Sequence, residues 1–443
     1  MWFASTAQIW RIGRATEKVT AAERLIALMT NISDKVNRGT VIQSSRQYWQ
    51  DSRASRLATR FMRVVRRLLS HDSHGEQRRR ILHRLLALQW SLLCNYIRLS
   101  STVAWIRLWH RRRRVVVISQ VVHMGDIVAC EPIIRHVRQQ EPGAFIVFAA
   151  QRSFRALSDS HPAVDYTLPL YCFTEWVRLA ERWPFDRIVD LNIEGRICPV
   201  CGVRGKARDK SAAINFDNYY HEHNLLNAYS LSAGLPELND RPRLYIDTGV
   251  QTAIDRLGLP PNFVVIHAAA NEPTRALPAA SWIEIGQFVE SNCGLPVVEI
   301  GLVAILGKSD TDTYRNLCGR LSILESAEVI RRCLIYLGTD SGPAHLANAV
   351  GAYGIIGLGS YHLFKRYTPY SGNYAEEKEC ELVRHDGPVN EMSVARMLAA
   401  IDRRIAALGL DQNARNRQLL MDSPCHCLNA SHPSVKIGGN QVK

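Results

Sequence analysis

The stretch YLGTDSGPAHLANAVGAYGIIGLGS, residues 336–360, places a polar Thr-Asp-Ser-Gly-Pro segment between two apolar runs. The first run ends at Gly338 and predicts a buried strand. A helix is predicted to begin after Ser341 and Gly342, with Pro343 in its first turn. Free backbone N–H groups at such a helix start face the sheet edge where α/β folds bind ligands. The stretch therefore predicts a cradle for an anion such as a diphosphate.

Two features of this cradle are left with alternatives. Either Asp340 or Ser341 suits the N-cap position, and Gly342 allows an anion to approach the backbone closely. His345 is predicted to lie one turn into the helix. There it either points at the ligand or is a core histidine held by a backbone carbonyl. The residues alone leave both interpretations open.

Strand and helix patterns alternate on both sides of this stretch. A polar segment at 234–249, with Pro, Gly and polar residues, predicts a domain boundary between two such series. The alternation predicts parallel sheets with right-handed crossovers, and hence an α/β fold with two doubly wound, Rossmann-like domains. The predicted strands are 115–119, 144–150, 186–192, 263–268, 295–301, 333–338 and 353–359, and the predicted helices are 131–140, 152–158, 281–291, 312–318, 325–332, 343–350 and 393–407.

The 443 residues exceed one ordinary core, so several segments are expected. We predict a basic amphipathic helical extension at 1–114 and a first Rossmann-like domain at 115–245. A second Rossmann-like domain is predicted at 246–410, followed by a polar tail at 411–443.

Positive charge is concentrated in the predicted extension. Residues 1–114 carry 23 Lys and Arg against 6 Asp and Glu, whereas the remaining residues carry 32 against 35. Residues 53–69 predict a cationic amphipathic helix, and further helical runs are predicted at 81–97 and 103–109. Such helices suit an anionic membrane surface, and packing against the enzyme body is the alternative. Nucleic acid is the least favoured partner because no recognisable binding module accompanies the charge.

The chain shows no sequence signal for a membrane span or a secretory leader. No window reaches the roughly 18 uninterrupted apolar residues that a spanning helix needs. The 11 cysteines are an odd number without a regular framework, which favours a reducing cytoplasm. We therefore expect a cytoplasmic protein, peripheral at the inner face of the membrane.

A second polar loop follows the strand at 115–119. In this segment, ISQVVHMGDIVACEP, Gly125 permits a tight turn and Asp126 precedes a helix, with His123 in the same loop. A carboxylate at the carboxyl end of the strand would face the cradle of the second domain and take a proton from an acceptor hydroxyl. The alternative is that Asp126 is only a helix cap.

Two motifs carry a family resemblance. The segments VVHMGDIVACEPIIRHVRQQEPGAFIVFAA (residues 121–150) and LGTDSGPAHLANAVG (residues 337–351) resemble glycosyltransferase family 9, the ADP-heptose:lipopolysaccharide heptosyltransferases. Further motifs between them occur in the family's order, and the resemblance covers about Val115 to Leu408. It implies a GT-B fold of two Rossmann-like domains facing a cleft, and inverting chemistry without a metal or other cofactor.

The resemblance also implies partners and site residues. The donor would be a nucleotide sugar, ADP-heptose, and the acceptor a lipid-linked or cell-surface glycan of the lipopolysaccharide-core type. Asp126 matches the general base. Arg275 stands where the family has a donor-contacting lysine. The implied donor-binding residues are Arg275, Thr339, Asp340, Ser341, Gly342, Pro343 and His345, and the implied acceptor-loop residues are His123 and Gly125.

Three departures from the family pattern leave other hypotheses open. The family's acidic residue near the ribose has no clear counterpart, although Asp310 or Asp312 could replace it. A Cys198-x-x-Cys201 pair interrupts a basic acceptor-side segment, and it is either two reduced thiols or part of a metal site completed by Cys425 and Cys427. Residues 1–114 have no family counterpart. The alternatives are a transferase with another donor, or with a protein or polysaccharide acceptor, and a non-catalytic nucleotide-sugar-binding protein.

Overall fold

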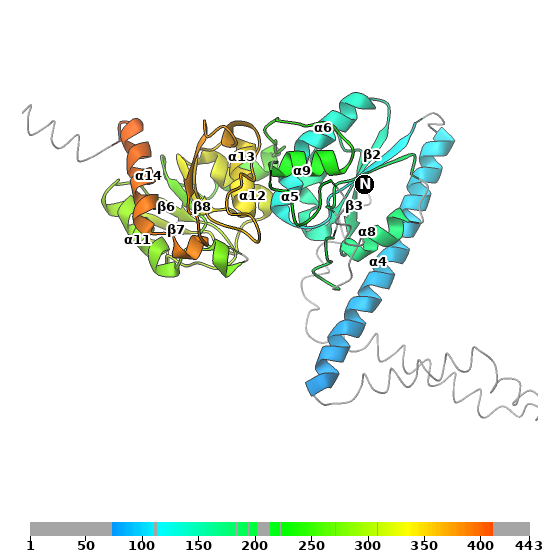
Figure 1. Cartoon of the computed structure of the whole chain (residues 1–443), viewed down its shortest axis with the longest axis horizontal. Helices are drawn as coiled ribbons and strands as arrows, with labels where there is room; N and C mark the ends of the chain where they lie inside the picture. Colours follow the sequence, from blue (N-terminus) through cyan, green and yellow to red (C-terminus); the bar gives the residue numbers. More distant parts are fainter. Residues whose placement is uncertain are drawn as a thin grey trace, which may run out of the picture. The chain divides into compact units, whose positions relative to one another are not determined.

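The computed structural model describes residues 73–109, 113–181, 185–193, 195–201, 213–221, 223–270, 272–307 and 309–410 (Figure 1). The described residues from Arg84 to Leu410 belong to one compact unit. The predicted cationic helix at 53–69 and the predicted tail at 411–443, with Cys425 and Cys427, lie outside the described residues.

The N-terminal sheet has four parallel strands in the order β3-β2-β1-β4. The apolar run at 115–119 is the inner strand β1, and all of its residues are buried, as its continuous β-branched pattern predicts. Alternate β1 residues serve two cores: Val116 packs with α5, α6 and α9, and Val117 packs with α4 and α8. The strands are β1 (Val115–Ser119), β2 (Phe145–Gln151), β3 (Tyr166–Leu170) and β4 (Arg187–Asp190).

The helices of this half follow the predicted alternation only in part, because β3, α8 and α9 were not predicted. Asp126 was predicted to precede or cap a helix, but it lies inside α5, whose N-cap is His123. α6 occupies the predicted 131–140, with Pro132 in its first turn. The predicted helix at 152–158 is instead divided into a 3₁₀ turn and a short helix. The helical segments are α5 (Met124–Ala129), α6 (Glu131–Gln140), η2 (Arg152–Phe154), α7 (Ala156–Asp159), α8 (Phe173–Ala180) and α9 (Leu225–Ser232).

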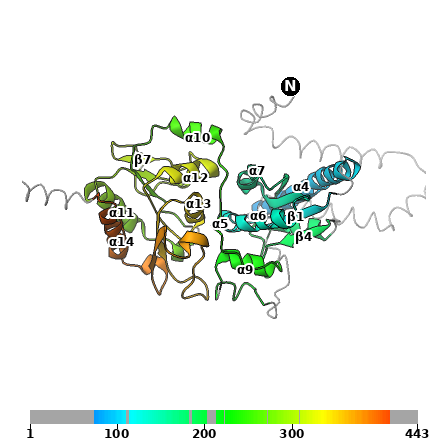
Figure 2. The same ribbon diagram turned by 90° about the horizontal axis from the view of Figure 1, so that it is seen from above.

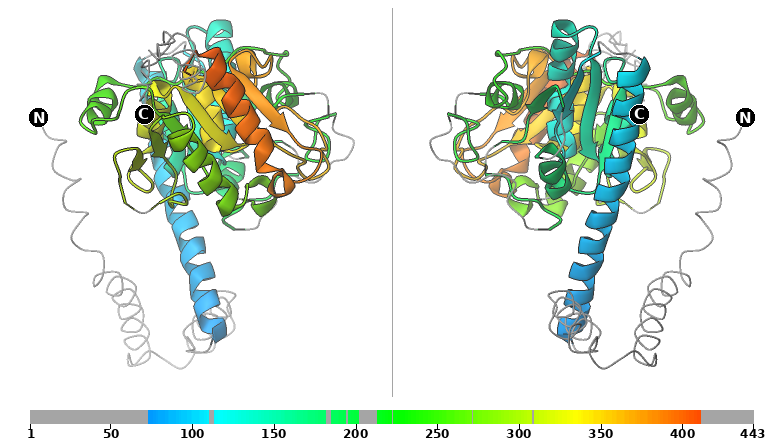
Figure 3. Two further views of the ribbon diagram at one scale, coloured as in Figure 1. Left: turned by 90° about the vertical axis from the view of Figure 1, so that its left-hand side faces the viewer. Right: turned by 90° about the vertical axis from the view of Figure 1, so that its right-hand side faces the viewer.

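α4 (Ser73–Trp109) is one continuous helix where the sequence suggested two runs, at 81–97 and 103–109. The intervening residues stay helical because Leu99 is fully buried, like Leu88 and Ile106, against the N-terminal sheet. Figure 3 shows the later half of α4 alongside the strands of this sheet. None of the helices in the described ranges is long and apolar enough to cross a membrane.

The C-terminal sheet has six parallel strands in the order β10-β9-β8-β5-β6-β7. The helix predicted at 312–318 is wrong, because residues 314–316 form strand β7 in parallel register with β6. Strand β10 was not predicted. The strands are β5 (Val264–Ile266), β6 (Val297–Glu299), β7 (Tyr314–Asn316), β8 (Ile335–Thr339), β9 (Gly354–Leu358) and β10 (Cys380–Arg384).

Helices cover both faces of the C-terminal sheet. α11 and α14 share a core on one face, and α12 and α13 cover the other face. The core beneath α12 and α13 is continuous with the core beneath α5, α6 and α9. Helices α5 and α13 therefore lie side by side (Figure 2). The helical segments are α10 (Thr248–Asp255), η3 (Pro273–Arg275), α11 (Ala279–Ser291), α12 (Ile323–Arg332), α13 (Gly342–Val350), η4 (Gly372–Tyr374), η5 (Val389–Glu391) and α14 (Val394–Ala407).

Candidate functional site

The two polar loops singled out in the sequence meet where α5 touches α13. A Cβ atom on Gly125 would lie 2.6 Å from Cδ2 of His345, and one on Gly342 would collide with the Met124 side chain. The clash at Gly342 is with the terminal methyl group of a flexible side chain, whereas the clash at Gly125 is with the buried ring of His345, so the contact requires a glycine at position 125. The loop before α5 is also unusual, because His123 adopts a left-handed φ of 66°. The sequence predicted two facing loops, and their close contact depends on Gly125.

Asp126 is paired with an arginine from the loop after β4. Arg196 Nη2 lies 2.9 Å from Oδ2 of Asp126 and 3.3 Å from the Tyr229 hydroxyl. Burial raises the pKa of Asp126, but Arg196, His123 and Tyr229 outweigh that effect and hold the pKa below its usual value. Asp126 is therefore a carboxylate rather than a neutral acid, although only 16% of its side chain is exposed.

Arg196 and Tyr229 were not identified from the sequence. Arg196 was one of several basic residues in a segment that departed from the family pattern, and it is 70 positions from Asp126. Pairing at that separation has no local signal in the chain. Burial lowers the pKa of Arg196, but the Tyr229 and Asp126 interactions outweigh it, so the guanidinium stays charged.

Asp340 is buried and holds Arg275. Arg275 Nη2 lies 2.7 Å from Oδ2 of Asp340 and 2.5 Å from its backbone carbonyl oxygen. The Tyr367 hydroxyl donates to the same carboxylate at 2.7 Å. On the far side, the guanidinium carbon of Arg275 lies 4.6 Å from the ring centre of Tyr361. This arrangement makes Asp340 the residue that orients the Arg275 fork.

His345 is buried beside Asp340 and Gly125. Its Nε2 lies 4.0 Å from Oδ1 of Asp340, and its ring centre lies 4.9 Å from that of Tyr370. Burial lowers the pKa of His345 despite the nearby carboxylates, which favours a neutral imidazole. Within the described ranges no backbone carbonyl or other group bonds its Nδ1. The structure thus lacks the carbonyl contact that the core-histidine interpretation requires.

The remaining predicted residues line the start of α13. Thr339 ends β8 with its hydroxyl buried, and Ser341 occupies the N-cap position without a side-chain capping bond. Pro343 lies in the first turn, as predicted. The Ser341 hydroxyl instead lies 3.4 Å from Nδ1 of His267, a residue that the sequence analysis missed. His267 follows strand β5, so its place at the carboxyl end of the sheet was its only signal.

Several buried nitrogen atoms in this region have no hydrogen-bond partner among the described residues. They are Nη1 of Arg196, Nε of Arg275 and Nδ1 of His345. Buried polar atoms are usually hydrogen-bonded, so such a group of unused nitrogens points to a ligand. Arg196 and Arg275 also act on the same neighbouring side chain, His123. Burial lowers the pKa of His123, Asp126 opposes this, and both Arg196 and Arg275 add to the lowering. The site can hold a polyanion beside a carboxylate.

Asp310, one of the two candidate ribose-binding residues, is hydrogen-bonded to strand β7. Asp310 accepts a hydrogen bond from the backbone N–H of Asn316 at 2.9 Å and lies at the outer β7 edge of the sheet. Glu299, at the end of β6, is fully buried and accepts hydrogen bonds from Tyr314 and from the backbone of Ile305. These hydrogen bonds hold the loop after β6 in place.

Comparison with known proteins agrees with this fold. Residues 222–378 match the sequence model of glycosyltransferase family 9 (heptosyltransferase). No curated protein sequence matches the chain. Among solved structures, a family 9 glycosyl transferase from Veillonella parvula is 13% identical, covering 66% of this chain and 97% of its own, with a TM-score of 0.51. The ADP-heptose lipopolysaccharide heptosyltransferase II of E. coli is 17% identical, covering 67% and 99%, with a TM-score of 0.50.

Proposed function

Because this chain is a glycosyltransferase with a family 9 (heptosyltransferase) domain and a GT-B-like fold, we propose that it transfers heptose from ADP-heptose to a hydroxyl of a lipopolysaccharide-core-type acceptor. The observation that carries the proposal is that a candidate base and candidate diphosphate-binding groups, from different halves of the chain, lie at one site. The Asp126 carboxylate comes from the N-terminal half. The C-terminal half supplies Nε of Arg275 and Nδ1 of His345, which have no hydrogen-bond partner among the described residues.

The proposed reaction is one in-line displacement. Asp126 takes the proton of the acceptor hydroxyl, and the hydroxyl oxygen bonds to the anomeric carbon of the donor. The bond from that carbon to the diphosphate breaks, and ADP leaves with the electron pair. Attack opposite the leaving group inverts the anomeric centre. No metal is assigned a role in this chemistry.

Arg275 and the start of α13 are proposed to bind the diphosphate. Asp340 and Tyr367 orient the guanidinium, and its Nε remains available for a phosphate oxygen. The backbone N–H groups after Ser341 and the dipole of α13 add positive potential at the same place. Charge that develops on the leaving diphosphate is thereby stabilised in a buried setting.

The experiment is a turnover assay with an ADP-heptose donor and a lipopolysaccharide-core acceptor, with the product identified by mass. Asp126→Asn is expected to lower turnover by about 10²- to 10⁴-fold while donor binding, measured by calorimetry, persists. The matched control is Asp159→Asn, which alters an exposed carboxylate of α7. Equal turnover of Asp126→Asn and the unmodified chain would contradict the proposed base.

A nucleotide panel separates the alternatives. ADP, GDP, UDP and their sugar conjugates are titrated into the full chain and its His345→Ala variant. Selective ADP binding that the variant weakens supports the donor assignment. Tight GDP or UDP binding reassigns the donor. Binding without transfer to the core acceptor, a polysaccharide or a protein would favour a non-catalytic nucleotide-sugar-binding protein.

We also propose that α4 rests on an anionic membrane surface, where the acceptor lipid resides. The face of α4 opposite its buried residues exposes Leu86, Trp90, Leu93, Ile97 and Leu108, at spacings that follow one helical stripe. Arg84, Arg98 and Arg107 are exposed on the same helix, and no Asp or Glu occurs between Glu76 and Asp126. An apolar stripe with basic neighbours and no acids suits an anionic leaflet.

A further inference from the structure

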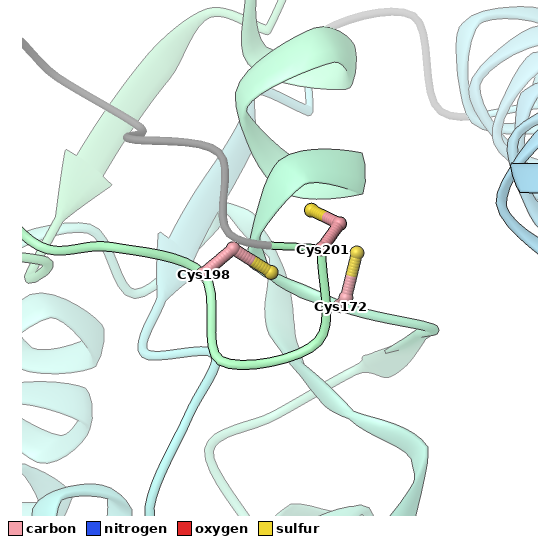
Figure 4. A group of neighbouring side chains, drawn as sticks. All are labelled: Cys172, Cys198 and Cys201. Atoms are coloured by element: carbon pink, nitrogen blue, oxygen red, sulfur yellow. The ribbon is translucent and has the colours of Figure 1, made fainter. Parts of the chain in front are cut away.

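Three cysteines from separate parts of the chain lie together beside the N-terminal sheet. Cys172 follows β3 and caps the N-terminus of α8, while Cys198 and Cys201 lie in the loop after β4. Their sulfur atoms all lie within 4.8 Å of one another (Figure 4). Cys172 and Cys198 are buried, and Cys201 is half-buried. The sequence analysis noted the Cys-x-x-Cys pair, but Cys172 has no sequence signal that links it to the pair.

Polar groups of the chain contact these sulfur atoms, and the Thr174 hydroxyl lies 2.6 Å from the sulfur of Cys201. The backbone N–H of Cys201 donates to the sulfur of Cys198, and so does that of Thr174. The backbone N–H of Glu175 donates to the sulfur of Cys172. Two of these donors belong to the first turn of α8. Such N–H to sulfur contacts orient thiolate ligands in metal sites.

Three sulfur atoms within 4.8 Å of one another are close enough to share a single cation. No lysine or arginine is bonded to any of the three sulfurs in the described part of the chain. Reduced thiols in a core would need only ordinary packing, and none of the other described cysteines belongs to such a group of three ligands. Convergence of three sulfurs with backbone donors is the pattern of a soft-metal ligand set.

We propose that Cys172, Cys198 and Cys201 bind a thiolate-preferring divalent ion of the Zn²⁺ class, with one further donor completing a tetrahedral set. The ion has a structural role and takes no part in sugar transfer. It joins the chain after β3 to the loop after β4. The Cys-Pro-Val-Cys turn supplies two ligands from one short segment, as in other zinc sites.

The ion would hold one end of the loop that carries Arg196. At the other end, the Asn192 backbone N–H and side-chain amide donate to Asp190, which also accepts from the Ser119 hydroxyl of β1. Arg196 lies between this network and Cys198, and its guanidinium reaches Asp126. Anchoring both ends limits how far the loop can carry Arg196 from Asp126. The metal site would thus preorganise an ion pair of the candidate active site.

The first test is the metal content of the full chain after purification without added metal and without chelator. About one equivalent of zinc per chain is expected in the unmodified protein and in Cys333→Ser, which changes a distant cysteine after α12. Cys198→Ser and Cys201→Ser are expected to lose most of the metal. A chain that folds, carries no metal and binds no added Zn²⁺ would overturn the proposal.

A second measurement does not depend on a variant that folds. The metal is exchanged for Co²⁺ in the unmodified chain, and a thiolate-to-cobalt charge-transfer absorption with the intensity of three sulfur ligands is expected. A cobalt spectrum of oxygen and nitrogen ligands alone would overturn the assignment.

Loss of the metal in a Cys425→Ser and Cys427→Ser chain, with retention in Cys198→Ser, would place the metal elsewhere. None of these readouts requires sugar transfer.

Discussion

Arg196 Nη2 and Asp126 Oδ2 lie 2.9 Å apart and join the loop after β4 to the first turn of α5. The pair is largely buried, with 10% and 16% of the two side chains exposed. A base that must accept a proton is thus held beside a permanent positive charge. The pairing keeps Asp126 ionised over a wide pH range and lowers its intrinsic basicity. It therefore controls the pH at which the proposed base works.

Arg196→Gln is expected to move the acidic limb of the kcat/KM profile to higher pH. The folded pKa of Asp126 is lowered by Arg196, so its removal raises that pKa, by about one to three pH units for a close ion pair. Activity that requires the carboxylate would then fail at a higher pH as the solution is acidified. The measurement is kcat/KM against pH. The control is Arg187→Gln, which breaks the more exposed pair with Glu141, and an unmoved acidic limb in Arg196→Gln would contradict the assignment.

Gly125→Ala is expected to disturb the contact between α5 and α13. The new methyl would lie 2.6 Å from Cδ2 of His345, and overpacking of this kind typically costs about 1–3 kcal/mol. The free energy of unfolding, from chemical denaturation, and the turnover rate are measured together, and both are expected to fall. Gly143→Ala is the matched control, because nothing lies within 4 Å of its added carbon.

A double variant sharpens this prediction. In Gly125→Ala with His345→Ala the clash is removed, so the two stability losses should not add. Strict additivity in the double variant would show that the two residues do not press on each other.

His267 predicts acid-dependent stability. Burial lowers the pKa of His267 from 6.5 to about 4. The unfolded chain therefore binds a proton there at a higher pH than the folded chain does. The neutral His267 makes its full contribution to the free energy of unfolding above pH 6.5. That contribution, at most about 3 kcal/mol, is lost as the pH falls towards 4. The free energy of unfolding is measured from pH 7.5 to 4.5.

His267→Gln is expected to flatten that dependence. His83→Gln, at an exposed position on α4, serves as the control and should leave the slope unchanged. The same steep loss of stability in His267→Gln and in the unmodified chain would assign the effect to other groups.

The membrane proposal predicts that the full chain sediments with vesicles that contain anionic lipid. Trp90→Ser with Leu93→Ser and Ile97→Ser is expected to lower the vesicle-binding constant by about 10³-fold or more, because about 1.5–3 kcal/mol is lost for each of the three large apolar side chains that the membrane would bury. The control is Leu302→Ser with Val303→Ser, which removes apolar side chains that are 87% and 71% exposed elsewhere. Substitution is preferable to deletion of 1–114, because deletion would also remove Leu99 and Ile106 from the core.

Two outcomes would contradict this proposal. One is equal binding of the triple variant and the unmodified chain. The other is a concentration-dependent dimer that the triple substitution abolishes while vesicle binding is absent, which would make the stripe an interface between two copies.

Local sequence patterns predicted most of the fold. The continuous β-branched run of β1 and the Pro-started helix α6 were correct because burial on both faces and first-turn proline act within a few residues. β7 was missed because a three-residue strand exists only through its pairing with β6. The break expected in α4 near residues 98–102 was also wrong, since Leu99 is held in the helix by the sheet below it.

The sequence by itself determined the alternation of strands and helices and the polar loops at Gly125-Asp126 and Asp340–His345, because these depend on periodicity and on residues that begin helices. Only the tertiary structure decided which partners these loops have. Arg196 on Asp126, Asp340 on Arg275 and Cys172 beside Cys198 are separated by 70, 65 and 26 positions in the chain. Contacts at such separations come from the packing of parallel strands, which brings their carboxyl ends to one edge whatever lies between them.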